Sequence, residues 1–183
     1  DSLKSSFQKL SRWKTIKGIP AKVLTIEEIN NHYTGDTQQL RIKKAIKDIY
    51  DSENNALKYV LLGGDNDIVP SQNCYIHYSD YTHTDVPVDW FYACLETMNW
   101  DNNGNSLFGE LSDSVSLSPS IIVSRVPVRN ISDVNICVDR IISYESHTEG
   151  ACNKNILMTG NTLNNNYTGD VVCKGQKMYN TYI

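Results

Sequence analysis

The sequence lacks several features that mark membrane proteins and nucleic-acid-binding proteins. Its longest apolar runs, such as Ile121–Val123, fall far short of the roughly 20 residues that a membrane-spanning helix needs. No apolar segment of a signal peptide follows Asp1. The 17 lysines and arginines are outnumbered by 21 aspartates and glutamates. This excess of negative charge argues against nonspecific binding to nucleic acid, which needs a positive surface.

The cysteines and histidines also lack the spacings that are typical of metal sites. The five cysteines are an odd number without a CxxC pair, so at most two internal disulfides can form. The four histidines show no metal-ligand spacing. Cys94 and Cys137 lie in apolar runs and are expected to be buried. Cys152 and His147 are close in sequence, but nothing nearby would orient the imidazole, so they make a poor catalytic pair.

The apolar residues that are present alternate between two periodicities. Steps of three and four predict amphipathic helices around 3–16, 42–50 and 134–142. Continuous apolar runs predict strands, and polar stretches predict long loops at 71–89 and 99–110. Helices alternating with strands favour an α/β fold with a mostly parallel sheet, and a flavodoxin-like domain is one form of it. The expected strands are residues 21–26, 59–62, 89–95, 120–125 and 155–160.

One candidate site follows the strand predicted over residues 59–62. There Gly63-Gly64-Asp65 places a carboxylate at the carboxyl end of a buried strand, where α/β proteins form their sites. Asp65 is either a ligand or metal carboxylate or part of a turn that the glycines make possible. A nucleotide site is disfavoured, because neither a GxGxxG pattern nor a phosphate-binding lysine follows. Arg125, at the end of another buried strand, is expected to form a structural ion pair.

A second candidate is the loop rich in Asn and Gly that begins at Asp101. Asp101, Asn103 and Asn105 supply oxygen atoms at alternate positions, as the first ligands of an EF-hand do. The glycine and the final glutamate of an EF-hand are missing, so the loop is not an EF-hand. It is either a shorter calcium loop closed by Glu110 or a plain turn.

The order of these segments resembles the gingipain family of cysteine peptidases, over roughly residues 5–160. A strand ending in Gly-Asp with a proline five residues later, and an Arg-x-Pro-Val strand leading to a Tyr-Glu helix end, are specific in combination. The matching segments are Phe7 to Val23, Tyr59 to Pro70, Asp89 to Ala93, Trp100 to Glu110, and Ile122 to Val128 with Tyr144-Glu145.

The resemblance implies a caspase-like fold, a three-layer α/β sandwich, in an endopeptidase that is secreted or bound to the cell surface. In this family a histidine and a cysteine of the second subdomain attack the peptide bond. Residues 1–150 would be the first subdomain and 151–183 the opening of the second, with both chain ends cut. The dyad has no counterpart here, so it is expected beyond residue 183, and protein or peptide substrates would bind through the second subdomain.

The resemblance also implies a structural calcium ion but no other cofactor. Asp65 matches a calcium-binding aspartate of the family, and Asp89, Asp101 and Glu110 are further candidates. Asp170 lies near the position of an aspartate that reaches the specificity pocket, but the favoured interpretation is that it caps a helix. Two other functions stay open: a caspase-like module that binds or regulates without catalysis, and an unrelated α/β domain that binds a small ligand.

Overall fold

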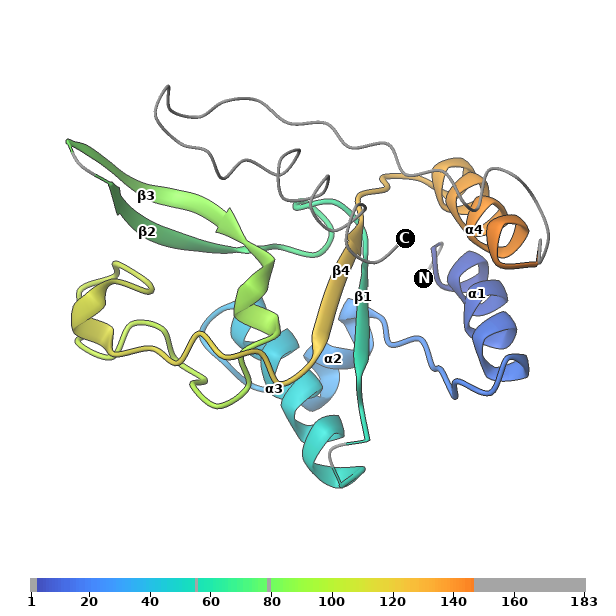
Figure 1. The fold of residues 1–183 in the computed structure, drawn as a ribbon, viewed down its shortest axis with the longest axis horizontal. Coiled ribbons are helices and arrows are strands. Elements are labelled where there is room, and N and C mark those ends of the chain that lie inside the picture. The colour runs from blue at the N-terminus through green and yellow to red at the C-terminus, as the bar shows by residue number, and fades with distance from the viewer. Residues whose placement is uncertain (1–2, 55, 79, 147–183) are drawn as a thin grey trace, which may run out of the picture. The chain divides into compact units, whose positions relative to one another are not determined.

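A computed structural model describes residues 3–54, 56–78 and 80–146 (Figure 1). The chain divides into two compact units, Asp1–Ser143 and Tyr144–Ile183, and the fold below is that of the first unit with helix α4. The predicted subdomain boundary at residue 150, the strand over 155–160 and Asp170 lie outside the described residues. The helices are α1 (Lys4–Ile16), α2 (Ile26–His32), α3 (Gln38–Ser52) and α4 (Ile131–Ser146), and the strands are β1 (Tyr59–Gly63), β2 (Gln72–Tyr78), β3 (Tyr81–Val88) and β4 (Ile122–Val126).

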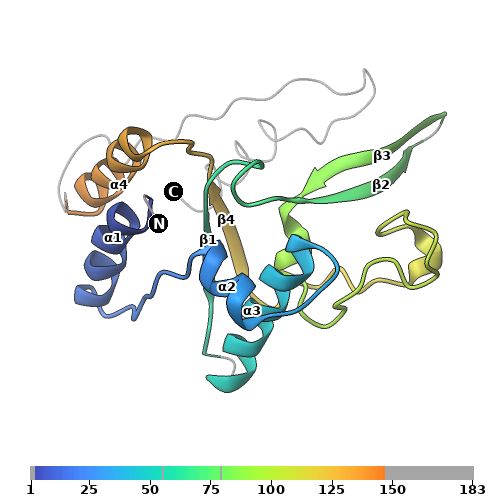
Figure 2. The ribbon, with the colours of Figure 1, turned by 180° about the vertical axis from the view of Figure 1, so that it is seen from behind.

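The first unit is built around the parallel pair β1 and β4, with Tyr59 opposite Ile122 and Gly63 opposite Val126. One face of the pair packs through Leu62 on the apolar side of α3. The other face meets α1 and α4, and a Cβ atom at Gly63 would lie 2.7 Å from the ring of Phe7 in α1. Figure 2 shows α2 and α3 in front of the strands. Helices on both faces of a parallel pair confirm the α/β class and are compatible with a caspase-like sandwich.

The amino-terminal helix ends as its sequence predicts. Gly18 has φ +88°, and the main-chain N–H groups of Gly18 and Ile19 donate to the carbonyls of Thr15 and Lys14. This paired arrangement is a Schellman motif, for which glycine is the preferred residue.

The strand predicted over residues 21–26 is wrong. Residues 17–25 form no strand, and α2 begins at Ile26. The reason is a capping box: the Thr25 hydroxyl accepts from the Glu28 main chain, and the Glu28 carboxylate accepts from the Thr25 main chain. The Thr-x-x-Glu spacing that signals such a box is visible in the sequence. Local capping therefore outweighs the β-branched composition here.

Two predictions around Pro70 are also wrong. The expected loop over residues 71–89 is the antiparallel hairpin β2–β3, and the expected strand over 89–95 is a 3₁₀ turn, Asp89–Tyr92, followed by irregular chain. The second error concerns conformation and not burial, because Phe91 to Leu95 are all buried. The outer part of the hairpin, residues 76–78 and 80–85, is exposed and mostly polar or aromatic, which hides its strands from a search for apolar runs.

Lys43 of α3 is a charged side chain that lies fully buried in the core. Its Nζ donates to the carbonyl of Thr97 at 2.7 Å and lies 3.9 Å from the ring centre of Phe91 and 5.3 Å from that of Trp100. The aromatic faces stabilise the cation. Burial nevertheless dominates and lowers the pKa of Lys43 to about 7. The ammonium group ties α3 to the segment that leads into the 99–113 loop.

The lowered pKa of Lys43 predicts a rise in stability with pH. Between pH 7 and 10.5 the unfolded chain binds a proton that the folded chain does not, so the free energy of unfolding increases by up to about 1.4 kcal/mol per pH unit. Urea denaturation of the wild type and of Lys43→Met at pH 7 to 8.5 should show this slope only in the wild type. The exposed Lys44→Met is the control and keeps the slope. If stability rises equally with pH in the wild type and in Lys43→Met, the lowered pKa of the buried Lys43 is contradicted.

Candidate functional site

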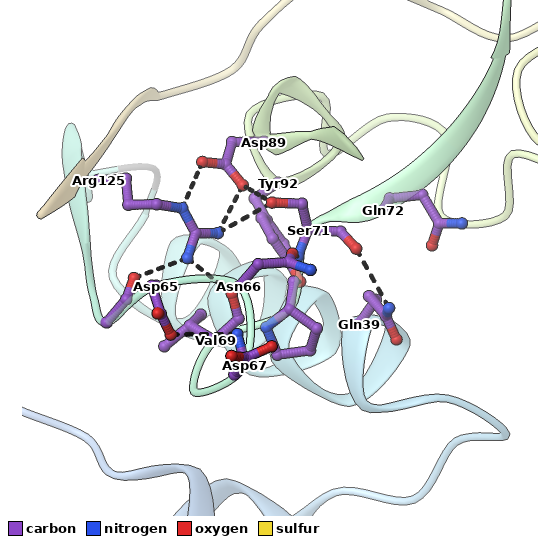
Figure 3. A network of polar contacts seen from close by, with 12 residues as sticks. Gln39, Asp65, Asn66, Asp67, Val69, Ser71, Gln72, Asp89, Tyr92 and Arg125 are labelled. Atoms are coloured by element: carbon purple, nitrogen blue, oxygen red, sulfur yellow. Dashed lines mark hydrogen bonds and ion pairs between the residues drawn. The ribbon is translucent and has the colours of Figure 1, made fainter. Parts of the chain in front are cut away.

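The turn after β1 is held by the guanidinium of Arg125, which projects from β4 (Figure 3). Nη1 donates to the carbonyls of Gly64 and Val69 at 2.8 and 2.7 Å. Nε and Nη2 donate to the two carboxylate oxygens of Asp89 at 2.7 and 2.6 Å. Nη2 also donates to the Ser71 hydroxyl at 3.2 Å. One side chain therefore joins the turn, the start of the hairpin and the 3₁₀ turn, which confirms the expected structural ion pair.

The sequence explains why these partners meet. Gly64 and Asp65 continue the β1–β4 ladder, since their N–H groups donate to the carbonyls of Val126 and Val128. The chain then turns back, because the N–H groups of Ile68 and Val69 donate to the Asp65 carbonyl. A Cβ at Gly64 would lie 2.7 Å from Ile68, so the tight turn needs glycine.

Arginines hold the two carboxylates at this edge in their charged form. Arg129 forms an ion pair with Asp65, whose pKa falls below its ordinary value because hydrogen bonds and charge from Arg129 outweigh burial. Burial alone would raise the pKa of Asp89. The hydrogen bonds from Arg125 and Ser71 outweigh burial, so the pKa of Asp89 lies below its ordinary value. Both predicted metal ligands thus have cationic partners, and the geometry at this edge gives no support for a metal ion bound to Asp65 or Asp89.

The 99–113 loop is organised by Asp113, which is 1% exposed and which sequence reasoning missed. Its two carboxylate oxygens accept from the main-chain N–H groups of Asn102, Asn103, Gly109 and Glu110, at 2.8 to 3.4 Å. The available signal was an acidic residue three positions after Glu110, because the two form a capping box around the 3₁₀ turn Leu111–Asp113. A buried carboxylate with four N–H donors fixes the loop without a metal ion.

The four predicted calcium ligands of this loop do lie together. The side-chain Nδ2 groups of Asn103 and Asn105 both donate to Oε1 of Glu110 at 2.6 Å. The Asp101 carboxylate accepts from the main chain of Asn105 and Ser106 at 2.9 and 3.0 Å. As oriented, the amides present nitrogen to Glu110, whereas calcium takes oxygen. Rotation of both amides would present their oxygens but would break the bonds that these oxygens accept from the main-chain N–H groups of Asn105 and Leu107 at 3.0 and 2.8 Å. The donor set fits calcium only after that change.

No ready catalytic group appears within the described ranges. Cys74 and Cys94 are buried, and burial raises the pKa of Cys74 to about 11 and also raises that of Cys94. Such thiols are poor nucleophiles, because the thiolate is the reactive form. Across the described residues, no hydrogen bond joins a cysteine to a histidine, and no three side chains of His, Cys, Asp or Glu are grouped to hold a metal ion. Cys152, Cys173 and His147 lie outside those residues.

Replacement of Arg125 by methionine should cost about 3 kcal/mol of unfolding free energy, because it leaves Asp89 without a cation and two carbonyls without a donor. Urea denaturation at pH 7 measures the loss. The control, Arg129→Met, removes an arginine that is 75% exposed and should cost clearly less than Arg125→Met, because solvent screens its ion pair.

The pH dependence of the Arg125→Met effect follows from the lowered pKa of Asp89. The stability that the pair contributes is present above the ordinary carboxyl pKa and is lost as the pH falls through the folded value. The difference between the wild type and Arg125→Met should therefore shrink in acid. Equal costs for the two arginine variants would show that the Arg125 contacts do not hold the turn.

Comparison with known proteins places the chain in a family. The model of peptidase family C25 matches residues 1–182. Comparisons with curated proteins and with solved structures find no match. In the described part, no helix is both long and apolar enough to cross a membrane. The family match covers nearly all of the sequence and agrees with the α/β fold and with the segments from Phe7 to Glu145 that resemble gingipains. The chain therefore belongs to peptidase family C25, the gingipain family of cysteine peptidases.

Proposed function

We propose that this chain is the amino-terminal, noncatalytic subdomain of a gingipain-like cysteine endopeptidase whose histidine and cysteine dyad lies beyond residue 183. The subdomain acts as a scaffold: β1 and β4 start a parallel sheet, and the Arg125 contacts fix the turn at its edge. The enzyme would cut protein or peptide substrates outside the cell.

The state of the described thiols supports a noncatalytic role. A cysteine peptidase needs an accessible sulfur with a lowered pKa beside a histidine. Cys74 and Cys94 instead lie in the core with raised pKa values. The half-buried Cys137 lies on α4 in the cluster that packs against α1. This burial of sulfur is the observation that carries the proposal.

The test replaces all five cysteines of residues 1–183 by alanine in the intact enzyme. We expect peptide hydrolysis to persist and to remain sensitive to iodoacetamide, because the attacking sulfur lies elsewhere. Residues 1–183 expressed alone should cut no peptide. If the replacement abolishes hydrolysis and circular dichroism shows the fold intact, the proposal fails. If the intact wild-type protein cuts nothing, the alternative of a caspase-like binding module is favoured.

We propose further that calcium binds the 101–110 loop through Asp101, Asn103, Asn105 and Glu110. The support is that these four side chains lie close together and that Glu110 carries a negative charge at neutral pH. Hydrogen bonds from Ser112, Asn103 and Asn105 lower the pKa of Glu110. Calcium would displace the two amide nitrogens from the carboxylate and hold the loop by its oxygens.

Calcium should then raise the melting temperature by mass action. The measurement compares about 5 mM calcium, enough for a site of extracellular affinity, with a chelator. Glu110→Gln should lose the rise, whereas Glu53→Gln, an exposed glutamate of α3's carboxyl end, should keep it. A melting temperature that calcium leaves unchanged in the wild type would remove the metal from the proposal.

A further inference from the structure

The amino-terminal segment is strongly basic although the chain as a whole is acidic. Residues 2–26 contain six lysines and arginines and no aspartate or glutamate, whereas the whole chain has a formal charge of -4. The six are Lys4, Lys9, Arg12, Lys14, Lys17 and Lys22. Positive charge that is concentrated on one side of an acidic protein attracts an anionic partner to that side.

The acidic partners of these cations do not cancel their charge. Lys4, Lys9 and Lys22 form ion pairs with acidic residues of α2, α4 and the end of α3, namely Glu28, Asp139 and Glu53. These pairs are partly or largely open to water, and exposed pairs hold their members only weakly. Arg12 is exposed and forms no ion pair with the residues that the structure describes.

Two isoleucines stand exposed within this basic segment. Ile16, the last residue of α1, is 81% exposed, and Ile19, which follows the glycine of the Schellman motif, is 47% exposed. A single exposed isoleucine is ordinary, but two at one turn make a small apolar patch. An apolar patch rimmed by lysine and arginine is typical of segments that lie in the interface of a membrane.

Polar contacts fasten the turn that carries Ile19 to α1. The Ser11 hydroxyl donates to the carbonyl of Ala21 at 2.6 Å, and the Ala21 N–H donates to the Thr15 hydroxyl at 3.1 Å. The two isoleucines are therefore presented by a fixed frame, which lowers the entropy lost on binding. In both views the carboxyl end of α1 lies at the outer edge of the fold, on the side away from the hairpin (Figures 1 and 2).

A hollow of about 480 Å³ lies beside Ile16, between α1 and α4. Its apolar lining is Trp13, Ile16 and Ile142, and Arg12 stands at its side, while no acidic residue is among the described residues that line it. The Lys17 ammonium lies 5.6 Å from the ring centre of Trp13. Cations beside tryptophan and isoleucine suit the boundary between phosphate headgroups and acyl chains, where tryptophan is enriched.

We propose that this surface docks on an anionic lipid bilayer. We call it the α1 face and define it by Arg12, Trp13, Ile16, Lys17 and Ile19. Its cations would meet the headgroup phosphates, and its isoleucines would enter the boundary with the acyl chains. A soluble polyanion would use the cations but gain nothing from the isoleucines, so the exposed apolar side chains favour lipid. Docking needs no catalysis and is independent of the proposed function.

Sedimentation of the intact protein with lipid vesicles measures docking. Vesicles of phosphatidylcholine with about one third phosphatidylglycerol should bind the protein at least about tenfold more tightly than phosphatidylcholine alone. Added salt should weaken the binding, because it screens the attraction. Arg12→Gln/Lys17→Gln should reduce the affinity at least about tenfold and flatten its salt dependence. Ile16→Ser/Ile19→Ser should reduce it about fivefold and keep the salt dependence.

Matched controls carry the same changes elsewhere on the surface. Ile76→Ser/Ile131→Ser removes two isoleucines that are 43% and 45% exposed. Lys44→Gln/Lys47→Gln removes two cations of α3 and changes the net charge by the same amount as the α1 variant. Both controls should bind vesicles as the wild type does, and circular dichroism checks that every variant keeps the fold.

Three results would overturn the inference. The wild type binds both kinds of vesicle equally or neither, the controls lose as much affinity as the α1 variants, or heparin binds through Arg12 and Lys17 while vesicles do not. The first result needs no variant, so the inference can fail even if a substitution unfolds the protein. A protein that docks but cuts no peptide would count against the proposed function alone, and hydrolysis without docking would count against this inference alone.

Discussion

The described structure depends on one guanidinium group. Arg125 leaves β4 at the carboxyl edge of the parallel pair and donates to Gly64, Val69, Ser71 and Asp89, which lie 61 to 36 residues away in sequence. These partners belong to the turn after β1, the chain entering the hairpin and the 3₁₀ turn. A lysine could not make the same contacts, because the planar guanidinium offers several donors in fixed directions. The guanidinium of Arg125 thus fixes the position at which the chain leaves β1 and enters the hairpin.

Internal neutralisation is the second theme of the molecule. Asp89 and Asp65 are matched by arginines, Asp113 by four main-chain N–H groups, and Lys43 by a carbonyl and two aromatic rings. Charges that are satisfied in this way hold segments in place. Asp80 and Asp85 of the hairpin are exposed and have no ion-pair partner among the described residues.

The sequence predicted the elements that repeat a strong pattern. Helices α1, α3 and α4 and strands β1 and β4 were all found, because their apolar residues recur at helical spacing or form continuous runs. Asn130 caps α4, because its Oδ1 accepts from the Asp133 N–H at 3.0 Å. The hairpin was missed because its outer part is exposed and its strands contain no continuous apolar run. Lys43 was missed because its burial depends on Thr97 and other segments distant in sequence. Asp113 and α2 were missed although their capping boxes were visible in the sequence.

A double-mutant cycle between Arg125 and Asp89 tests the central role of the guanidinium most directly. The unfolding free energies of Arg125→Met, Asp89→Leu and the double variant give the coupling energy of the pair. The structure predicts a coupling of at least about 2 kcal/mol, so that the double variant is more stable than the sum of the single losses implies. A coupling near zero would mean that the two side chains do not meet in the folded protein, which would contradict the account.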